Sequence, residues 1–157
     1  MRKVKKMRKL LIFSVLMPLM ALANTETIDG ITWTYSVRDG QATVGSDSTD
    51  VRAIPSGTFG AITVPSKLGD CPVTGIGKGA FESCTRVKSV TIPNGVTRIG
   101  ERAFYYCDSL TEVTIPSSVA SIGVCAFYGC NSLSSVVLPL GVTMIEESLF
   151  SGCAKLA

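Results

Sequence analysis

The chain repeats itself with a period of 23 residues. Four phenylalanines are separated by this step, a cysteine follows each of them by three residues, and a proline, a valine and an isoleucine recur with the same period. The positions are Phe81, Phe104, Phe127 and Phe150; Cys84, Cys107, Cys130 and Cys153; Pro93, Pro116 and Pro139; Val96, Val119 and Val142; and Ile99, Ile122 and Ile145. A period of this length predicts a repeat solenoid, in which successive coils stack and share one core.

The unit at residues 113–135 indicates how one coil is built. Val113 and Ile115 alternate with Thr114, which predicts a short strand with one face inward. With the leucine three residues earlier, the pattern is L-x-x-V-x-I, close to the leucine-rich pattern L-x-x-L-x-L. Pro116 ends the strand because it has no backbone donor. We expect stacked strands about 4.8 Å apart, with the phenylalanines as a structural column in the core.

Ile-Pro, Ile-Gly and Ala-Phe-x-x-Cys-x-x-Leu recur in register from Ile62 to Leu156. This combination resembles the BspA-like, or Treponema-type, leucine-rich repeat. The resemblance implies a right-handed leucine-rich-repeat coil with short parallel strands and short turns, in about four repeats over residues 61–157, the last incomplete. It also implies an exported bacterial surface protein, because such repeats are associated with surface attachment and host-protein binding. The last unit departs from the pattern at Glu146, which replaces glycine, and at Leu149, which replaces alanine.

Residues 1–23 are predicted to be a signal peptide. Six Lys and Arg residues precede the apolar run LLIFSVLMPLM, and Ala21-Leu22-Ala23 fits the small-residue cleavage rule. The apolar run is shorter than the roughly 20 residues that cross a bilayer. We therefore expect cleavage after Ala23, a mature chain with no membrane span, and a secreted or cell-surface protein.

The charge of the chain changes once the signal peptide is set aside. The full chain has a net charge of +3, from 15 Lys and Arg and 12 Asp and Glu. The first nine residues hold six of the cations and none of the acids, so nine cations and twelve acids remain, a net charge of −3. The basic balance of the full chain is therefore no argument for nucleic-acid binding.

Residues 24–60 are predicted to form an N-terminal hairpin cap and linker. The stretch ITWTYSV, from Ile31, alternates apolar and polar residues, and Asp39-Gly40 separates it from a second short run. Asp-Gly between two such runs is typical of a β-hairpin. A solenoid needs a cap over its first coil, and Trp33 is expected to plug it. The alternative is an exposed Trp33 ring that stacks on a ligand.

The other end of the chain stops at Ala157, where the next strand of the repeat is expected. An uncapped sheet edge promotes aggregation. We therefore expect the sequence to be an N-terminal fragment of a longer repeat protein.

The sequence supports no catalytic, metal or cofactor site. Equivalent side chains of stacked coils point the same way, which is poor geometry for disulfides, so the four periodic cysteines are predicted to be buried thiols. The redox state of Cys71 and Cys125 stays open. The chain has no histidine, no Cys-x-x-Cys and no phosphate-binding loop before a helix. The carboxylates lie mostly at variable positions, where a solvated charge is the simpler explanation. We expect a protein that is not an enzyme.

Two surfaces are candidate binding sites. The first is a group of tyrosines, Tyr105, Tyr106 and Tyr128. Tyr105 and Tyr128 occupy the same position in successive units, and tyrosine is favoured at interfaces. Packing beside the neighbouring phenylalanines is the alternative. The second surface is an outward strand face with Thr91, Thr114 and Glu112, if residues 90–92, 113–115 and 136–138 are adjacent strands.

These features favour a non-catalytic protein-binding or adhesion module outside the cytoplasm. Its partner would be an extracellular protein or glycan, since a repeat stack supplies an extended surface. The alternative is a structural spacer of a larger surface or secreted protein whose functional domain lies beyond residue 157.

Overall fold

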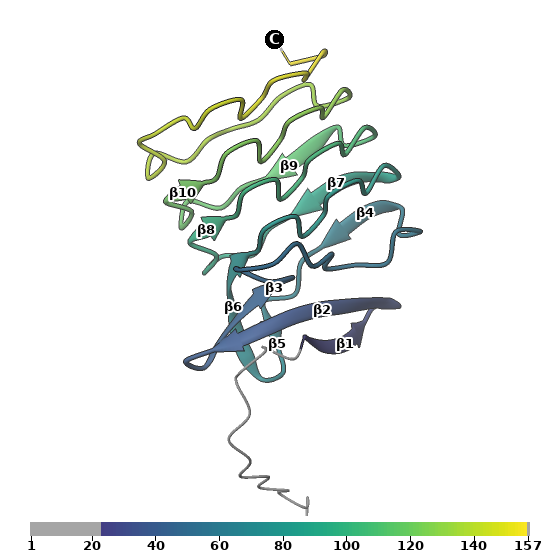
Figure 1. Ribbon diagram of the computed structural model, residues 1–157, viewed down its shortest axis with the longest axis vertical. Coiled ribbons are helices and arrows are strands. Elements are labelled where there is room, and N and C mark those ends of the chain that lie inside the picture. Colours follow the sequence, from purple (N-terminus) through teal and green to yellow (C-terminus); the bar gives the residue numbers. More distant parts are fainter. Residues whose placement is uncertain (1–22, 157) are drawn as a thin grey trace, which may run out of the picture.

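The computed structural model of the protein describes residues 23–156. The predicted signal peptide lies outside these residues except for Ala23. Within them, the secondary structure consists of β-strands joined by turns (Figure 1). The strands are β1 (Asn24–Ile28), β2 (Ile31–Arg38), β3 (Gln41–Val44), β4 (Gly60–Thr63), β5 (Lys67–Leu68), β6 (Cys71–Ile76), β7 (Val87–Thr91), β8 (Arg98–Ile99), β9 (Glu112–Thr114) and β10 (Ser121–Ile122).

Successive coils stack on one another from the cap toward the C-terminal end (Figure 1). One parallel sheet has the order β4-β7-β9, and a second path runs β3-β6-β8-β10, also parallel. The register follows the repeat, since Val90 pairs with Val113 in the first sheet and Ile99 pairs with Ile122 in the second. The predicted leucine-rich-repeat fold with short parallel strands is confirmed at this level.

The phenylalanines form a continuous stack through the core. The Phe81 and Phe104 rings are 4.9 Å apart with an interplanar angle of 2°, and the Phe104 and Phe127 rings are 5.2 Å apart at 1°. All three side chains are fully buried. The ring spacing is close to the distance of about 4.8 Å between paired strands. The rings therefore stack flat because the backbone holds them at that distance.

Glycine at the Ile-Gly corners lets neighbouring coils approach. A Cβ atom built on Gly100 would lie 2.8 Å from the carbonyl carbon of Gly77, and one on Gly123 would lie 2.6 Å from the backbone nitrogen of Glu101. Each glycine N–H donates to the preceding coil, Gly100 to Ile76 O at 2.8 Å and Gly123 to Ile99 O at 2.9 Å. The repeat needs glycine here because a side chain would displace the coil beneath it.

The N-terminal residues fold over the first coil. β2 and β3 pair antiparallel across Asp39-Gly40, where the alternating sequence predicts a hairpin. Trp33 is buried, and its ring meets Phe81 edge-on at 6.3 Å and 79°. Trp33 thus extends the phenylalanine stack into the cap, as the plug interpretation predicts. The sequence did not predict β1, which pairs antiparallel with β2, or the β5–β6 hairpin. The boundaries at residues 23 and 60 stay predictions.

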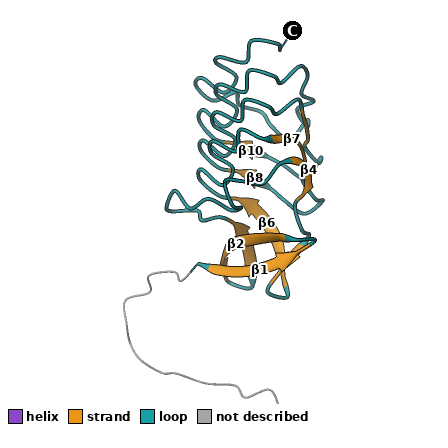
Figure 2. Ribbon diagram, turned by 90° about the vertical axis from the view of Figure 1, so that its right-hand side faces the viewer, coloured by secondary structure: helices purple, strands orange, loops and turns teal. Residues whose placement is uncertain are grey.

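The last coil is less regular than the prediction. Residues 136–138, expected to be a strand beside β9, have no strand assignment, and Val137 is 81% exposed. One long backbone hydrogen bond, from Ser134 N–H to Thr111 O at 3.4 Å, links this stretch to the coil before it. Backbone pairing with the coil before therefore stops at Ser134, two residues before this stretch. Figure 2 shows the final coils as loop.

The phenylalanine stack should dominate the stability of the protein. Phe104→Ala is expected to lower the free energy of unfolding by about 3–5 kcal/mol, because it leaves a cavity between two rings. Phe59→Ala is the matched control, since Phe59 is 69% exposed and its ring lies beside the guanidinium of Arg86 in a cation–π pair at 5.2 Å. Its loss should be below about 1 kcal/mol. Urea unfolding of both variants checks this, and equal losses would contradict the stacked core.

Candidate binding surfaces

Three tyrosines of two adjacent coils form a cluster at the surface. The Tyr105 and Tyr128 rings stack at 5.0 Å and 20°. Tyr106 stands across both, at 4.5 Å from Tyr105 and 5.6 Å from Tyr128. Tyr106 is 43% exposed, and the other two are half-buried. The structure therefore brings together the three tyrosines that the sequence singled out.

Backbone geometry fixes the position of Tyr106. Its φ angle is 54°, in the left-handed region that non-glycine residues rarely adopt. The equivalent residue of the next coil is Gly129, whose missing Cβ would lie 2.4 Å from Cδ1 of Tyr106. Tyr106 N–H also donates to Tyr128 O at 2.8 Å. The ring lies against Gly129 because glycine leaves the space for it.

Arg102 connects the tyrosine cluster to the preceding coil. Its guanidinium lies over the Tyr105 ring at 4.3 Å, and its Nη2 donates to Glu82 Oε1 at 2.7 Å. Within residues 23–156 its buried Nε has no hydrogen-bond partner. The sequence did not single out Arg102, although it lies 23 residues before Cys125 and both residues have positive φ. From this turn the Arg102 side chain reaches the Tyr105 ring of its own coil.

The strand-face candidates lie on β7 and β9. Thr91 pairs with Thr114, and Ser89 pairs with Glu112. Thr91, Thr114 and Glu112 are all exposed, so the predicted outward direction of their side chains is confirmed. The row does not continue as a strand into residues 136–138. The face is small and polar, and it makes no contact with the tyrosine cluster that the structure records.

The periodic cysteines form a hydrogen-bonded ladder between coils. Three of the four Sγ atoms donate to the phenylalanine carbonyl of the coil before, Cys107 to Phe81 O at 3.0 Å and Cys130 to Phe104 O at 3.1 Å. Cys153 makes the same contact with Phe127 O at 3.1 Å. Only a protonated thiol can donate in this way. The sequence predicted buried thiols but gave no signal for this contact, because the acceptor lies in a different repeat.

Burial keeps these thiols protonated. It raises the pKa of Cys84 to about 11 and that of Cys130 to about 12, and it raises the pKa of Cys107 well above its ordinary value. Cys153 is only partly buried, in contrast to the prediction for the whole column, and burial raises its pKa as well. Cys153 is more open because no described coil covers it. Thiolate chemistry at these positions is therefore disfavoured.

Alkylation should separate the two kinds of cysteine. In native protein at pH 8, iodoacetamide should modify the partly exposed Cys71 and Cys125 and leave Cys84, Cys107 and Cys130 unmodified until denaturant is added. Mass spectrometry of digested protein gives the modification at each site, and Cys125 serves as the internal control. Native modification of Cys107 at the rate of Cys125, or disulfides within the column, would contradict the ladder.

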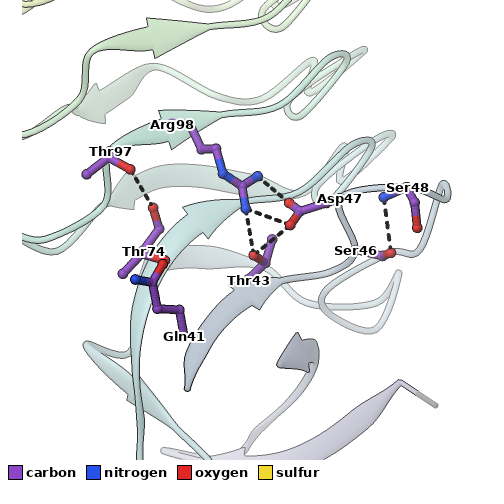
Figure 3. Close-up of polar contacts among 8 residues, drawn as sticks. All are labelled: Gln41, Thr43, Ser46, Asp47, Ser48, Thr74, Thr97 and Arg98. Atoms are coloured by element: carbon purple, nitrogen blue, oxygen red, sulfur yellow. Dashed lines mark hydrogen bonds and ion pairs between the residues drawn. The ribbon is translucent and has the colours of Figure 1, made fainter. Parts of the chain in front are cut away.

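A polar network ties the cap to the second sheet path (Figure 3). The guanidinium of Arg98, on β8, makes a two-pronged contact with the carboxylate of Asp47, with Nη2 to Oδ2 at 2.6 Å. Nη2 also donates to Thr43 Oγ1 at 3.0 Å. Burial acts to raise the pKa of Asp47, but hydrogen bonds and charge from Arg98, together with Thr43 and Arg38, outweigh it and hold the pKa below its ordinary value of 3.8. The sequence contained no signal for this pair because its members are 51 residues apart.

This ion pair should make stability depend on pH in acid. The folded-state pKa of Asp47 lies below the ordinary value of 3.8, so its contribution is present above that value and is lost as pH falls through the folded-state pKa. Asp47→Asn should cost about 1 kcal/mol or less at pH 7, the range for an accessible pair. The free energy of unfolding of this variant should also decrease less than that of the wild type as the pH falls from about 5 to about 2.

Thermal unfolding of wild type and variant across that pH range measures the effect. Asp39→Asn is the matched control, since Asp39 lies in the hairpin turn and makes no ion pair among the described residues. If Asp47→Asn loses stability in acid to the same extent as the wild type, the contact with Arg98 does not contribute to folding.

Among residues 23–156, no group of three or more His, Cys, Asp and Glu side chains is placed to hold a metal ion. No segment of these residues is a helix long and apolar enough to cross a membrane.

Comparison with known families places the repeat. The family model described as the BspA type leucine rich repeat region matches residues 53–157 with six copies. The match starts before the predicted repeat boundary at residue 61 and counts more copies than the four that the 23-residue period indicates. No curated protein matches the chain.

Solved structures of bacterial leucine-rich repeat proteins are similar to this one. A leucine-rich cell surface protein from Faecalibacterium prausnitzii is 29% identical over 84% of this chain, with a TM-score of 0.69. A leucine-rich repeat protein from Bacteroides ovatus is 34% identical over 81%, with a TM-score of 0.66. One from Bacteroides capillosus is 31% identical over 76%, with a TM-score of 0.63. This chain spans 32%, 33% and 86% of those three proteins, respectively.

Proposed function

Because the chain belongs to the BspA-type leucine-rich repeat family, we propose that it is an exported, non-catalytic module that binds or adheres to an extracellular protein or glycan through its repeat surface. The Faecalibacterium relative is described as a cell surface protein, which supports a location outside the cell. The predicted signal peptide supports export. The proposal includes a right-handed solenoid, in which each coil adds one row of side chains to the binding surface.

The tyrosine cluster is the observation that carries this proposal. Tyr105, Tyr106 and Tyr128 hold one another at ring distances of 4.5–5.6 Å, and Arg102 lies against them. Tyrosine and arginine are the residues most enriched at the energetic centres of interfaces. Rings that are already packed lose little conformational entropy when a partner binds. The cluster is therefore suited to be an anchor for a partner.

The strand face is the second part of the proposed surface. Thr91, Glu112 and Thr114 lie on two neighbouring strands and are solvent-exposed. They offer hydroxyl and carboxylate groups without an aromatic anchor. We assign this face a supporting role, because small polar contacts contribute less to affinity than buried aromatic ones.

Removing the rings should weaken binding without unfolding the protein. Tyr105→Ala combined with Tyr128→Ala should weaken binding to a panel of immobilised extracellular proteins and glycans by about tenfold or more, the effect of losing a hot spot. Tyr105→Phe with Tyr128→Phe is the matched control that keeps the stacked rings. Surface plasmon resonance measures affinity, and circular dichroism confirms folding.

A second set of variants tests the strand face separately. Thr91→Ala, Glu112→Ala and Thr114→Ala together should lower affinity less than the double tyrosine change does. If neither set alters binding of the protein to any member of the panel, the protein acts instead as a spacer that holds another domain, and the binding proposal is wrong.

A further inference from the structure

The strand β4 (Gly60–Thr63) has one side without a strand neighbour. In the sheet β4-β7-β9, β7 pairs with one side of β4, and in the part of the chain that the structure describes no strand pairs with the other side. Val64 N–H donates to Thr91 O at 3.0 Å. Backbone groups alternate in direction along a parallel edge strand, so those of Thr63 and Ala61 point away from β7. Such an edge is a template for an added strand.

The sequence of this strand contains none of the residues that usually protect an edge against pairing. Natural edge strands carry a charge, often lysine, or a proline, or they are covered by another segment. The strand reads Gly-Ala-Ile-Thr, with no charge and no proline. The side chains of Gly60 and Ala61 are small, so another backbone could approach closely. The bulge in the pairing with β7, between Gly60 and Ala61, leaves the rest of the edge regular.

A cavity of about 220 Å³ lies between this edge and the β1–β2 turn of the cap. Ile28 and Ile31 of the turn border it, together with Trp33, and Ala61 and Thr63 border it from β4. Pockets for drug-sized molecules hold roughly 300–1,000 Å³. This cavity is smaller, and most of the residues that border it are apolar, so it suits one or two aliphatic side chains.

The charge at the cavity indicates a basic partner. Asp29 is the only charged residue among those that border it, and its side chain is exposed in the β1–β2 turn. A carboxylate at the mouth of an apolar cavity favours a ligand that carries a cation next to an apolar group. A glycan could use the carboxylate but would leave the strand edge without partners.

We propose that the free edge of β4 binds an extended peptide segment of another protein, which adds a strand to the sheet β4-β7-β9. An aliphatic side chain of the peptide occupies the cavity beside Ile28 and Ile31, and a lysine or arginine two residues away, on the same face of the added strand, contacts Asp29. Main-chain hydrogen bonds supply affinity in this mode of recognition, and the side-chain pocket supplies specificity. This site shares no residue with the tyrosine cluster, so it adds a second type of partner to the proposed function.

Amide hydrogen exchange tests the edge directly. In the free protein, the amides of Ala61 and Thr63 should exchange fast, and that of Val64, bonded to Thr91 O, should be protected. The probe is the blocked peptide acetyl-Thr-Lys-Thr-Val-Thr-Val-amide, in which the lysine and both valines share one face of the extended chain. At saturation it should slow exchange at Ala61 and Thr63 by about tenfold or more, because paired strand amides open rarely. A version with N-methylated backbone should bind at least about tenfold more weakly, since it cannot donate.

Three variants define the contacts. Thr63→Pro removes the outward N–H while keeping the Val64 bond, because proline is accepted on an edge strand. It should weaken peptide binding by about tenfold or more, whereas the matched Thr63→Val, which keeps the N–H, should not. Asp29→Asn keeps the left-handed turn, since asparagine tolerates its φ of 51°. It should weaken binding of the lysine peptide and abolish its advantage over a peptide with glutamine in that place.

Each remaining outcome counts against the proposal. Protection of Thr63 in the free protein at every concentration would mean that the chain itself covers the edge. Protection that rises with protein concentration would mean that a second copy occupies it. Peptide binding that Thr63→Pro leaves unchanged, with the variant folded, would place the contact elsewhere. Loss of binding in the tyrosine variants but not in Thr63→Pro would overturn this inference and leave the proposed function intact.

Discussion

Backbone hydrogen bonds between coils hold equivalent residues about one strand spacing apart, and the rest of the repeat depends on that distance. Phe81 N–H donates to Ala103 O at 2.7 Å, and Phe104 N–H donates to Ala126 O at 2.8 Å. At this spacing, of about 4.8 Å, flat rings stack in parallel, and a thiol reaches the carbonyl of the neighbouring coil. A residue with a Cβ does not fit where the coils come closest, as at Gly123.

The same spacing arranges the outer surface. Tyr105 and Tyr128 stack because the backbone places them one coil apart. Asp108 accepts a hydrogen bond from Asn131 at 3.0 Å, also one coil apart. Like charges in such a row would repel each other, and an acid beside an amide avoids this. The surface of such a stack therefore consists of rows of equivalent side chains. Side chains in one row contact each other, so they must be compatible in shape and charge.

The sequence predicts what is periodic and misses what is not. Its 23-residue step located the phenylalanine column, the buried thiols of Cys107 and Cys130, and the pairing of Val90 with Val113. Alternation located the hairpin that carries Trp33. The Asp47–Arg98 pair and the cavity under β4 join segments that have no periodic relation, so only their folded positions bring them together. The sequence named all three tyrosines but not Arg102, whose contact with the Tyr105 ring depends on the folded turn.

Departures from the repeat decide where the stack changes and which surfaces stay open. Glu146 stands where the other corners have glycine, and among the described residues its N–H makes no backbone hydrogen bond to Ile122, the contact that Gly100 and Gly123 make with their preceding coils. The rings of Phe127 and Phe150 are correspondingly wider apart, at 5.6 Å and 11°. At the other end, the first unit has five more residues between Pro65 and Phe81 than the next unit has between Pro93 and Phe104. The β5–β6 hairpin lies in this longer segment, and the cap meets the first coil. The side of β4 away from β7 therefore faces the cap turn and not another coil, and no strand of the described residues pairs with it.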